Sequence, residues 1–475
     1  MPEKNRHKVV PDGKMNDAVR SSESKSASKL DIDRLIDVEP KAQSEGFQMS
    51  KIEEAVKSTN IPMILMIIGM LVFGLIVLYS VSAPDAYGQF NDSGWFFVRQ
   101  LRYTIVGLIM MLIIAFMPIS FFERKWVGVV AYVFSIGFSL ATIILGVGRE
   151  NGAVRWINIG PIQFQSSEFI KVALVIFFAG YRSSIEKLKK AGKIKKAKSD
   201  LGKLLINTSV DFIIPVCLCI LVDFIIILQP HLSCFIIIAA IIFMCALVSE
   251  IPLKSWVTGS IIMLLVGGAA GALVLALAPD IRSKVESRYA HVFKRIAIYS
   301  ADEDDIGEEE GDLTKDDTRQ VDNAHNALGS GGMWGVGIGN SRSKYNYVSE
   351  AQNDYIFSIY IEETGFVGGV FLVLMYMVMF FMCLRVCWRA KDLFSRTVAT
   401  GCTALIFVEM LMNLSVELQI IPATGVTLPF ISCGGTAQVS LLIAYGLILS
   451  VSRTGTVRAP KKRASISSKN VRTGV

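Results

Sequence analysis

From Val210 to Ser249 the chain is VDFIIPVCLCILVDFIIILQPHLSCFIIIAAIIFMCALVS, and this stretch decides the fold. It is about twice as long as the roughly 20 apolar residues that one membrane-spanning helix needs. Gln229-Pro230 interrupts the stretch near its middle. Proline removes a helical hydrogen-bond donor and disfavours helix in the residue before it. We therefore predict two spanning helices joined by a tight turn.

The rest of the chain also has the composition of a membrane protein. Of its 475 residues, 52% are hydrophobic and 19% are charged, and the mean hydropathy is +0.48. Soluble domains carry roughly 25% charged residues. Ten apolar runs of spanning length begin near Ile61, Leu101, Val127, Ser167, Val210, Leu232, Trp256, Tyr355, Thr397 and Thr436. We predict an all-α polytopic membrane domain over residues 61–453, with about ten transmembrane helices.

Clusters of positive charge predict which segments face the cytoplasm. Nine Lys/Arg against two acids lie between Arg182 and Lys203, and seven with no acid lie between Arg453 and Val475. Under the positive-inside rule these segments are cytoplasmic. Ten spans then place both termini in the cytoplasm. Because no aromatic residues are interleaved with these charges, we predict no nucleic-acid partner.

Polar tails flank the predicted membrane domain. Residues 1–60 are rich in Ser, Lys and Asp and lack the apolar core of a signal peptide. We predict a disordered cytoplasmic tail there and a basic cytoplasmic tail over residues 454–475.

A polar loop from Asp280 to Asn353 separates the seventh predicted span from the eighth, and we expect it to be extracytoplasmic. It holds nine Lys/Arg and fourteen Asp/Glu. Its glycine run, Gly329 to Gly339, is superficially similar to a phosphate-binding loop. Such loops need a preceding strand and a following helix within a soluble unit, so we exclude nucleotide binding. The acidic residues 302–305 and 308–310 either hold a divalent cation through oxygen ligands or form a solvated charge run.

Cysteine and histidine usage excludes two kinds of site. The eight cysteines lie almost all within apolar runs and none lies in the outer loop, so no disulfide framework is predicted. The four histidines are too sparse for a histidine-based metal cluster.

Unusual polar residues gather in the segments predicted to face outward. Glu168 and Lys171 are spaced i, i+3 and share one face of a helix near its outer end. They form either an ion pair that joins two helices or a site for an anionic group such as phosphate. Pro422 to Gly435 contains two prolines and three glycines. Irregular backbone at bilayer depth is tolerated only where protein buries it or it lines a cavity. This segment is therefore either a re-entrant loop or broken helix at a cavity wall, or a plain surface turn.

Several motifs in these segments are long enough to be specific. They are Asn151-Gly-Ala…Arg155-Trp156-Ile, Ser167-Glu168-x-x-Lys171, Gly329-Ser-Gly-Gly…Gly335-x-Gly-x-Gly-Asn-Ser, Glu350-Ala…Asp354-Tyr-Ile-Phe…Glu362-Glu363 and Thr424-Gly425…Leu428-Pro429-Phe430…Ser432-x-Gly434-Gly435. With them the chain resembles the SEDS family (shape, elongation, division and sporulation) of peptidoglycan polymerases, from about Ile61 to Arg453.

The resemblance implies a ten-helix glycosyltransferase that polymerises lipid II on the outer face of the bacterial cytoplasmic membrane. It also implies partners, namely a class B penicillin-binding transpeptidase and other divisome or elongation proteins. Two functions from other classes stay open, a lipid II flippase and a non-catalytic divisome scaffold. The long amino-terminal extension favours division, and so a septal location, over elongation, and a sporulation role is also open.

The resemblance further implies roles for individual residues. A carboxylate in the outer loop would act as the base, and its distance from Arg295 places it at Asp305, with Asp304 the close alternative. Residues 306–318 are an acidic insertion relative to the family, which keeps Asp302 open as well. Substrate binding is expected from Arg155, Glu168, Lys171, Lys344, Asp354, Glu363, Ser432 and Gly434. The one cofactor considered is a divalent cation, Mg²⁺ or Mn²⁺, which would stabilise the pyrophosphate leaving group.

Two further departures from the family pattern lie close to these residues. Ser166 stands where a proline usually precedes the Ser-Glu pair. His231 stands where an acidic residue commonly follows the Gln-Pro turn, so no role is carried over to it.

Overall fold

The computed structural model describes residues 60–146, 155–159, 162–194, 199–229, 231–277, 299, 315–345 and 351–456. These residues belong to one compact unit, Asn60–Val475. Nearly all of the two predicted tails lies outside the described residues. So do Asp302, Asp304 and Asp305.

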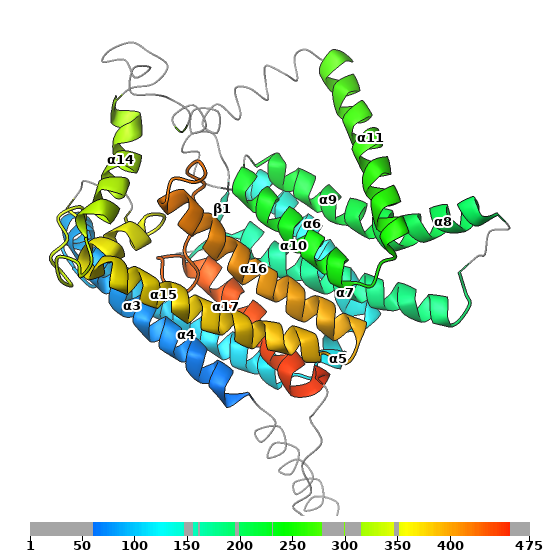
Figure 1. The fold of residues 1–475 in the computed structure, drawn as a ribbon, viewed down its shortest axis with the longest axis horizontal. Coiled ribbons are helices and arrows are strands. Elements are labelled where there is room, and N and C mark those ends of the chain that lie inside the picture. The colour runs from blue at the N-terminus through cyan, green and yellow to red at the C-terminus, as the bar shows by residue number, and fades with distance from the viewer. Residues whose placement is uncertain are drawn as a thin grey trace, which may run out of the picture. The chain divides into compact units, whose positions relative to one another are not determined.

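The described chain is almost entirely helical (Figure 1). Its helices are α3 (Ile61–Phe90), α4 (Trp95–Phe116), α5 (Ile119–Phe122), α6 (Lys125–Leu145), α7 (Ser166–Lys190), α8 (Asp200–Thr208), η2 (Ser209–Ile213), α9 (Ile214–Ile227), α10 (Leu232–Val248), α11 (Leu253–Leu277), α14 (Lys315–Ser330), α15 (Ile356–Arg389), α16 (Leu393–Glu417), α17 (Gly435–Ser450) and η4 (Val451–Gly455). An antiparallel hairpin, β1 (Trp156–Ile159) with β2 (Ile162–Gln165), departs from the all-α prediction.

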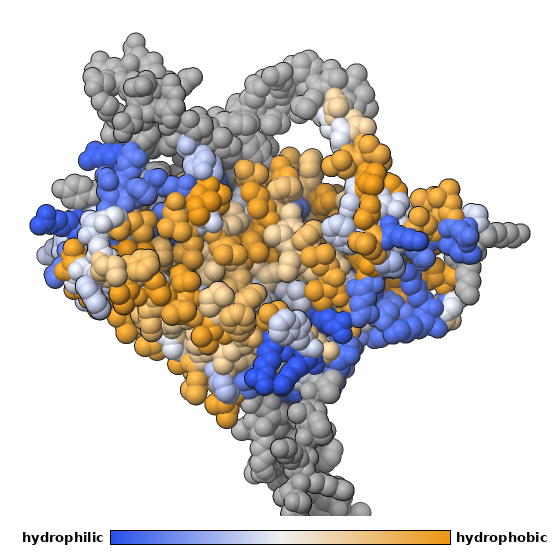
Figure 2. Space-filling model, viewed as in Figure 1, coloured by the Kyte–Doolittle hydropathy of each residue, from blue (hydrophilic) through white to orange (hydrophobic). Residues whose placement is uncertain are grey.

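Within the described residues, seven helical segments are long and apolar enough to cross a membrane. They are Ile61–Phe90, Trp95–Phe116, Lys125–Leu145, Asp200–Ile227, Ile356–Arg389, Leu393–Glu417 and Gly435–Gly455. Two shorter apolar segments accompany them, namely α10 (Leu232–Val248) and the part Leu253–Ala269 of α11. The chain is therefore a multi-pass membrane protein, and its space-filling surface is largely hydrophobic over the helices that face the viewer in Figure 2.

The predicted break in the stretch from Val210 to Ser249 is confirmed. One helix ends at Ile227 and the next begins at Leu232, on either side of the Gln-Pro pair. The first of these two helices continues backward without interruption through the π-helical turn η2 into α8, so this span begins earlier than predicted. A π-turn places one extra residue in the helix, and such turns are frequent at functional sites.

Helices α16 and α17 form the centre of the bundle. In each of them, 83% of the most apolar 18-residue stretch is buried by the rest of the protein, against 22% in α4 and in α6. α16 packs against α7, α10 and α15, and Figure 1 shows it between α10 and α15. α17 packs closely on α4, where a Cβ atom added at Gly446 would lie 2.8 Å from the Met111 carbonyl oxygen. Small residues allow such close helix approach where lipid removes the hydrophobic driving force.

Segments predicted to be cytoplasmic meet at one end of the helix bundle, and segments predicted to face outward meet at the other end. One end is held by hydrogen bonds that join segments predicted to be cytoplasmic: Asn60–Ser452, Ile119–Thr454, Ser183–Glu123, Arg396–Glu250 and Lys391–Gly455. The other end is held by bonds between segments predicted to face outward: Gln352–Asp85, Arg99–Gln163 and Gln100–Ser432. Two further bonds, Gln229–Ser139 and Ser233–Thr424, attach predicted spans to this end. We call the second group the outer end of the bundle.

Candidate functional site

A buried ionic triad joins α7 to α16 near the outer end. Glu168 lies in the first turn of α7, and its Oε2 is 2.8 Å from Lys171 Nζ, so the predicted i, i+3 pair is confirmed. The ammonium of Lys171 forms a second ion pair with Glu409 of α16. The exposed fractions are 7% for Glu168, 2% for Lys171 and 2% for Glu409. Lys171 therefore neutralises two carboxylates inside the bundle, which favours the interpretation of an ion pair that joins helices.

Sequence reasoning missed Glu409, which lies 238 residues from Lys171 along the chain. The available signal was a carboxylate in the middle of the apolar α16, because an ionisable group within a span is costly and needs a partner. Nothing in the sequence says which basic residue that partner is.

Glu409 begins a polar ladder on α16, with Asn413 and Glu417 following at intervals of four residues. Residues so spaced share one face of a helix. The Nδ2 atom of Asn413 donates to the carbonyl oxygens of Asp354 (3.0 Å) and Val426 (2.8 Å). One face of α16 therefore fixes the backbone of two predicted site segments.

The third member of the ladder, Glu417, caps α15. Its carboxylate accepts from the backbone N–H groups of Phe357 (3.1 Å) and Ser358 (2.9 Å) and from the Ser358 hydroxyl. These N–H groups lie in the first turn of α15 and have no partner within the helix. The α16 ladder thus sets the start of α15.

The segment from Pro422 to Gly435 is not a plain surface turn. Leu428, Phe430 and Ile431 are buried although the backbone there is not helical. Ser432 is buried too, and its polar groups are satisfied there. Its hydroxyl accepts from Leu428 N at 2.9 Å, and its carbonyl accepts from Gln100 Nε2 at 3.2 Å. From Leu428 to Ser432 the irregular backbone is therefore enclosed by protein, an environment in which irregular backbone is tolerated within a membrane. The segment leads into Gly434, the N-cap residue of α17.

Lys344 and Glu363, both predicted to bind substrate, pair with each other. Lys344 Nζ lies 2.8 Å from Glu363 Oε1 and also donates to the carbonyl oxygen of Ser80 on α3, at 3.2 Å. The Ser80 hydroxyl donates to the second oxygen of Glu363 at 2.6 Å. Both charged side chains are buried. These contacts attach the loop after α14 to α3 and α15.

The glycine run is part of the same attachment. Gly365 interrupts α15 with φ 72° and ψ −174°, and the loop binds this break through backbone hydrogen bonds. Val336 N and Gly337 N donate to the carbonyls of Glu362 and Glu363, at 2.9 and 3.0 Å. The glycine run thus supplies hydrogen bonds that a broken helix lacks.

Replacing Gly335 with alanine should loosen this attachment. Gly335 has φ 76°, and a Cβ atom there would lie 2.2 Å from the Glu363 carbonyl oxygen. Left-handed backbone alone costs a non-glycine residue about 1–2 kcal/mol. We expect Gly335→Ala to lower the thermal unfolding midpoint in detergent clearly. Gly329→Ala is the matched control, because nothing lies within 4 Å of its added Cβ. Equal midpoints for the two variants would contradict the attachment.

Arg155 and His231 lie near the ionic triad. Arg155 immediately precedes β1, and His231 is the buried N-cap residue of α10. Burial and the positive charges of Arg155 and Lys171 hold the pKa of His231 well below its usual range. The imidazole is therefore neutral at neutral pH and does not add a third positive charge.

The predicted site residues thus form two groups at the outer end. Arg155, Glu168 and Lys171 lie with Glu409, whereas Lys344 and Glu363 lie where the loop meets α15. Asp354 connects to the first group through the α16 ladder, and Ser432 connects to α4 through Gln100. Among the described residues, no group of three or more His, Cys, Asp or Glu side chains could hold a metal ion. The acidic residues considered for Mg²⁺ or Mn²⁺ lie outside the described part.

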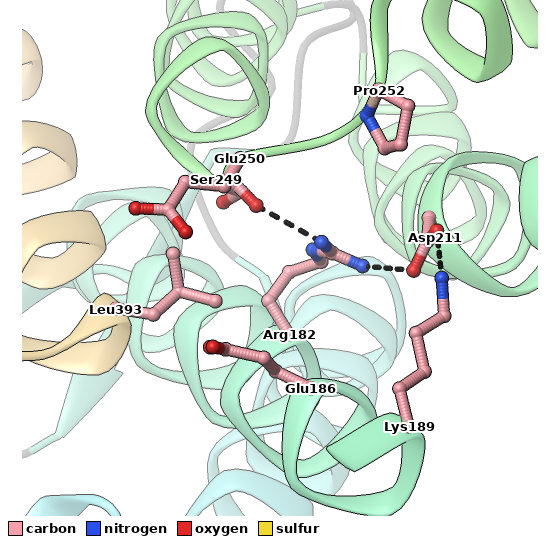
Figure 3. A pocket seen from close by; sticks show the side chains of 8 residues that line it. All are labelled: Arg182, Glu186, Lys189, Asp211, Ser249, Glu250, Pro252 and Leu393. Atoms are coloured by element: carbon pink, nitrogen blue, oxygen red, sulfur yellow. Dashed lines mark hydrogen bonds and ion pairs between the residues drawn. The ribbon is translucent and has the colours of Figure 1, made fainter. Parts of the chain in front are cut away.

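A separate polar pocket lies at the opposite end, where Figure 3 shows its lining. Arg182 donates to Asp211 Oδ1 at 2.7 Å and to the Ser249 carbonyl at 2.9 Å, and Lys189 pairs with the other oxygen of Asp211. Asp211 lies in the π-turn η2. The sequence analysis interpreted the positive charges of Arg182 and Lys189 as signals of membrane orientation. In the structure these two residues also hold η2 against α7. The pocket and the predicted site residues lie at opposite ends of the bundle, so we do not place the catalytic site in this pocket.

Comparison with known proteins gives one consistent family. The family model FTSW_RODA_SPOVE, described as cell cycle protein, matches residues 61–456. Stage V sporulation protein E of Bacillus subtilis is 30% identical over 400 residues, which cover 84% of this chain and 98% of that protein. A probable peptidoglycan glycosyltransferase FtsW of Trichlorobacter lovleyi is 28% identical, over 83% of this chain and 93% of that one.

Solved structures support the same fold. A chain from a peptidoglycan synthase complex that coordinates polymerization and crosslinking matches with a TM-score of 0.58 and 21% identity, over 83% of this chain and 98% of that one. A mutant of the rod shape determining protein RodA of Thermus thermophilus matches with a TM-score of 0.53 and 21% identity, over 83% and 97% of the two chains.

Proposed function

We propose that this chain, which belongs to the FtsW/RodA/SpoVE family, is a peptidoglycan glycosyltransferase that polymerises lipid II. The observation that carries the proposal is the extent of the family match, which spans the whole helical domain from residue 61 to 456. Curated relatives that match over more than four-fifths of this chain are probable peptidoglycan glycosyltransferases.

We place ten spans in the membrane over residues 61–453, with both termini in the cytoplasm and the loop 280–353 outside. The seven long apolar helices become ten when α7, α10 and α11 are added. α7 is less apolar than the seven because it carries Glu168, Lys171 and Arg182, but all three are buried, and the first two are paired with each other. Charges neutralised inside the bundle do not meet lipid.

In the proposed reaction Asp305 acts as general base, with Asp304 the close alternative. It takes the proton of an acceptor sugar hydroxyl as that oxygen attacks the anomeric carbon of the donor. The bond from this carbon to the pyrophosphate oxygen breaks, and undecaprenyl pyrophosphate leaves. A positioned carboxylate suits the first step, and positive charge near the leaving group suits the second.

The described residues contribute positioning to this scheme. Arg155 supplies positive charge at the outer end, beside a histidine that stays neutral. Glu168 and Lys171, held by Glu409, keep the start of α7 in place. A divalent cation, Mg²⁺ or Mn²⁺, at the acidic residues of the loop would assist the leaving group.

The proposed partners are a class B penicillin-binding transpeptidase and other proteins of the divisome or the elongation machinery, at the division septum. One structural neighbour belongs to a complex that coordinates polymerization with crosslinking, which supports a transpeptidase partner.

Purified full-length protein supplied with fluorescent lipid II, alone and with its transpeptidase, tests the function. We expect glycan polymers that a muramidase degrades. A flippase would instead carry lipid II across a vesicle membrane without forming polymer, and a scaffold would do neither. Trimming residues 1–58 and 456–475 should preserve polymerisation. Absence of polymer in every combination, with folded protein, would overturn the proposal.

A further inference from the structure

The loop after α14 exposes apolar side chains where a soluble loop would carry polar ones. Trp334 is 78% exposed and Ile338 is 71% exposed, and Met333 and Val336 are exposed as well. These four residues, which we call the apolar loop tip, fall within six positions of the glycine run. Isolated apolar residues at a surface are normal, but a cluster marks a contact with a partner or a membrane.

The apolar loop tip is held firmly against α15. Besides the bonds at Val336 and Gly337, Phe366 N donates to the Gly332 carbonyl at 2.8 Å and Val367 N donates to the Met333 carbonyl at 3.2 Å. The loop therefore bonds to both sides of the break at Gly365. Because the backbone is bonded on both sides, exposure of the tip is a property of the fold.

The break in α15 coincides with the start of its lipid-crossing part. Glu362 and Glu363 precede it, and no charged residue follows from Phe366 until Arg385. That interval is about 20 residues, which at about 1.5 Å each gives about 30 Å, the thickness of the hydrocarbon core. An uncharged stretch of this length suffices to cross the core, and the loop meets α15 where that stretch begins.

The tip is also continuous with the exposed apolar face of α15. Met333 is bonded beside Val367, and Phe366, Val367, Val370 and Phe371 are all exposed. Figure 1 shows α14 and the loop after it at the amino-terminal end of α15. Tryptophan is enriched at the membrane interface, where its ring meets the headgroups.

We propose that the apolar loop tip inserts into the outer leaflet and anchors the extracytoplasmic loop to the membrane surface. The occupant is phospholipid at the boundary between headgroups and acyl chains. Side chains that cover an interface in this way are buried by about 5–10 Å. The anchor would hold α14, and with it the end of the large loop, at a fixed height above the bilayer.

A photo-crosslinking amino acid placed at Ile338 tests the anchor in full-length protein within vesicles that contain alkyne-tagged phosphatidylglycerol. The matched control is Asn326, which is also exposed but lies on the polar helix α14. We expect several-fold more lipid adduct at position 338 than at 326. Quenching by lipids brominated near the headgroup should also fall when Trp334 is replaced with serine.

Equal lipid adducts at the two positions would overturn the proposal. So would a protein adduct at position 338 in cells in place of a lipid adduct, because the tip would then be a docking surface for a partner. Neither readout depends on glycan polymerisation, so the anchor can fail while the proposed enzyme activity stands.

Discussion

Replacing Lys171 with methionine should destabilise the bundle by about 3–5 kcal/mol, because it leaves buried carboxylates without a compensating charge. Lys171 pairs with both Glu168 and Glu409 in the ionic triad. The methionine has a similar length and fills the space, so the loss reports on charge and not on a cavity. The measurement is the thermal unfolding midpoint and the yield of monodisperse protein in detergent.

Lys187→Met provides the matched control. Lys187 also pairs with a glutamate, Glu123, at 2.6 Å, but its side chain is 66% exposed. Exposed ion pairs contribute roughly 0–1 kcal/mol, so this variant should unfold close to the parent midpoint. A Lys171→Met protein as stable as Lys187→Met would contradict the buried triad.

A triple variant separates the structural role of Lys171 from a role toward substrate. Glu168→Gln and Glu409→Gln, added to Lys171→Met, leave no uncompensated charge, and replacing a whole buried ionic group is often close to neutral for stability. We expect the triple variant to recover most of the lost stability. Recovered stability without polymerisation would show that one of these charges acts on substrate, whereas recovery of both would make the triad purely structural.

The fold was largely predictable because lipid imposes strong rules on sequence. The break at Gln229-Pro230, the ends of α9 and α10 and the local Glu168–Lys171 pair all follow from residues close together in the chain. The short hairpin β1–β2 was not predicted, because four-residue strands carry too little periodicity to be distinguished from a loop.

Long-range pairings could not be predicted from one sequence. Glu409 and Asp211 each show only as an acidic residue near apolar sequence, and their partners lie on other helices. The same holds for the glycine run, whose role depends on a helix break some thirty residues further on at Gly365. Of the residues expected to bind substrate, Lys344 and Glu363 turned out to be satisfied by each other, which no spacing rule anticipates.

Replacing Asp305 with asparagine should lower glycan polymerisation by about 10²–10⁴-fold, the usual contribution of a positioned general base. Asparagine has nearly the same shape but cannot accept the proton of the acceptor hydroxyl. Binding of lipid II and the thermal midpoint should stay near those of the parent. The measurement is the initial rate of polymer formation from fluorescent lipid II.

Neighbouring carboxylates supply the controls that assign the base. Asp304→Asn should have a much smaller effect if Asp305 is the base, and the reverse result would move the role by one residue. Asp322→Asn, on the exposed surface of α14, is the matched control for loss of negative charge in the loop. If Asp304→Asn and Asp305→Asn both polymerise normally, neither is the base and Asp302 becomes the candidate. A flippase needs no such base, so a selective loss of polymer at one of these positions also separates the enzyme from the transporter.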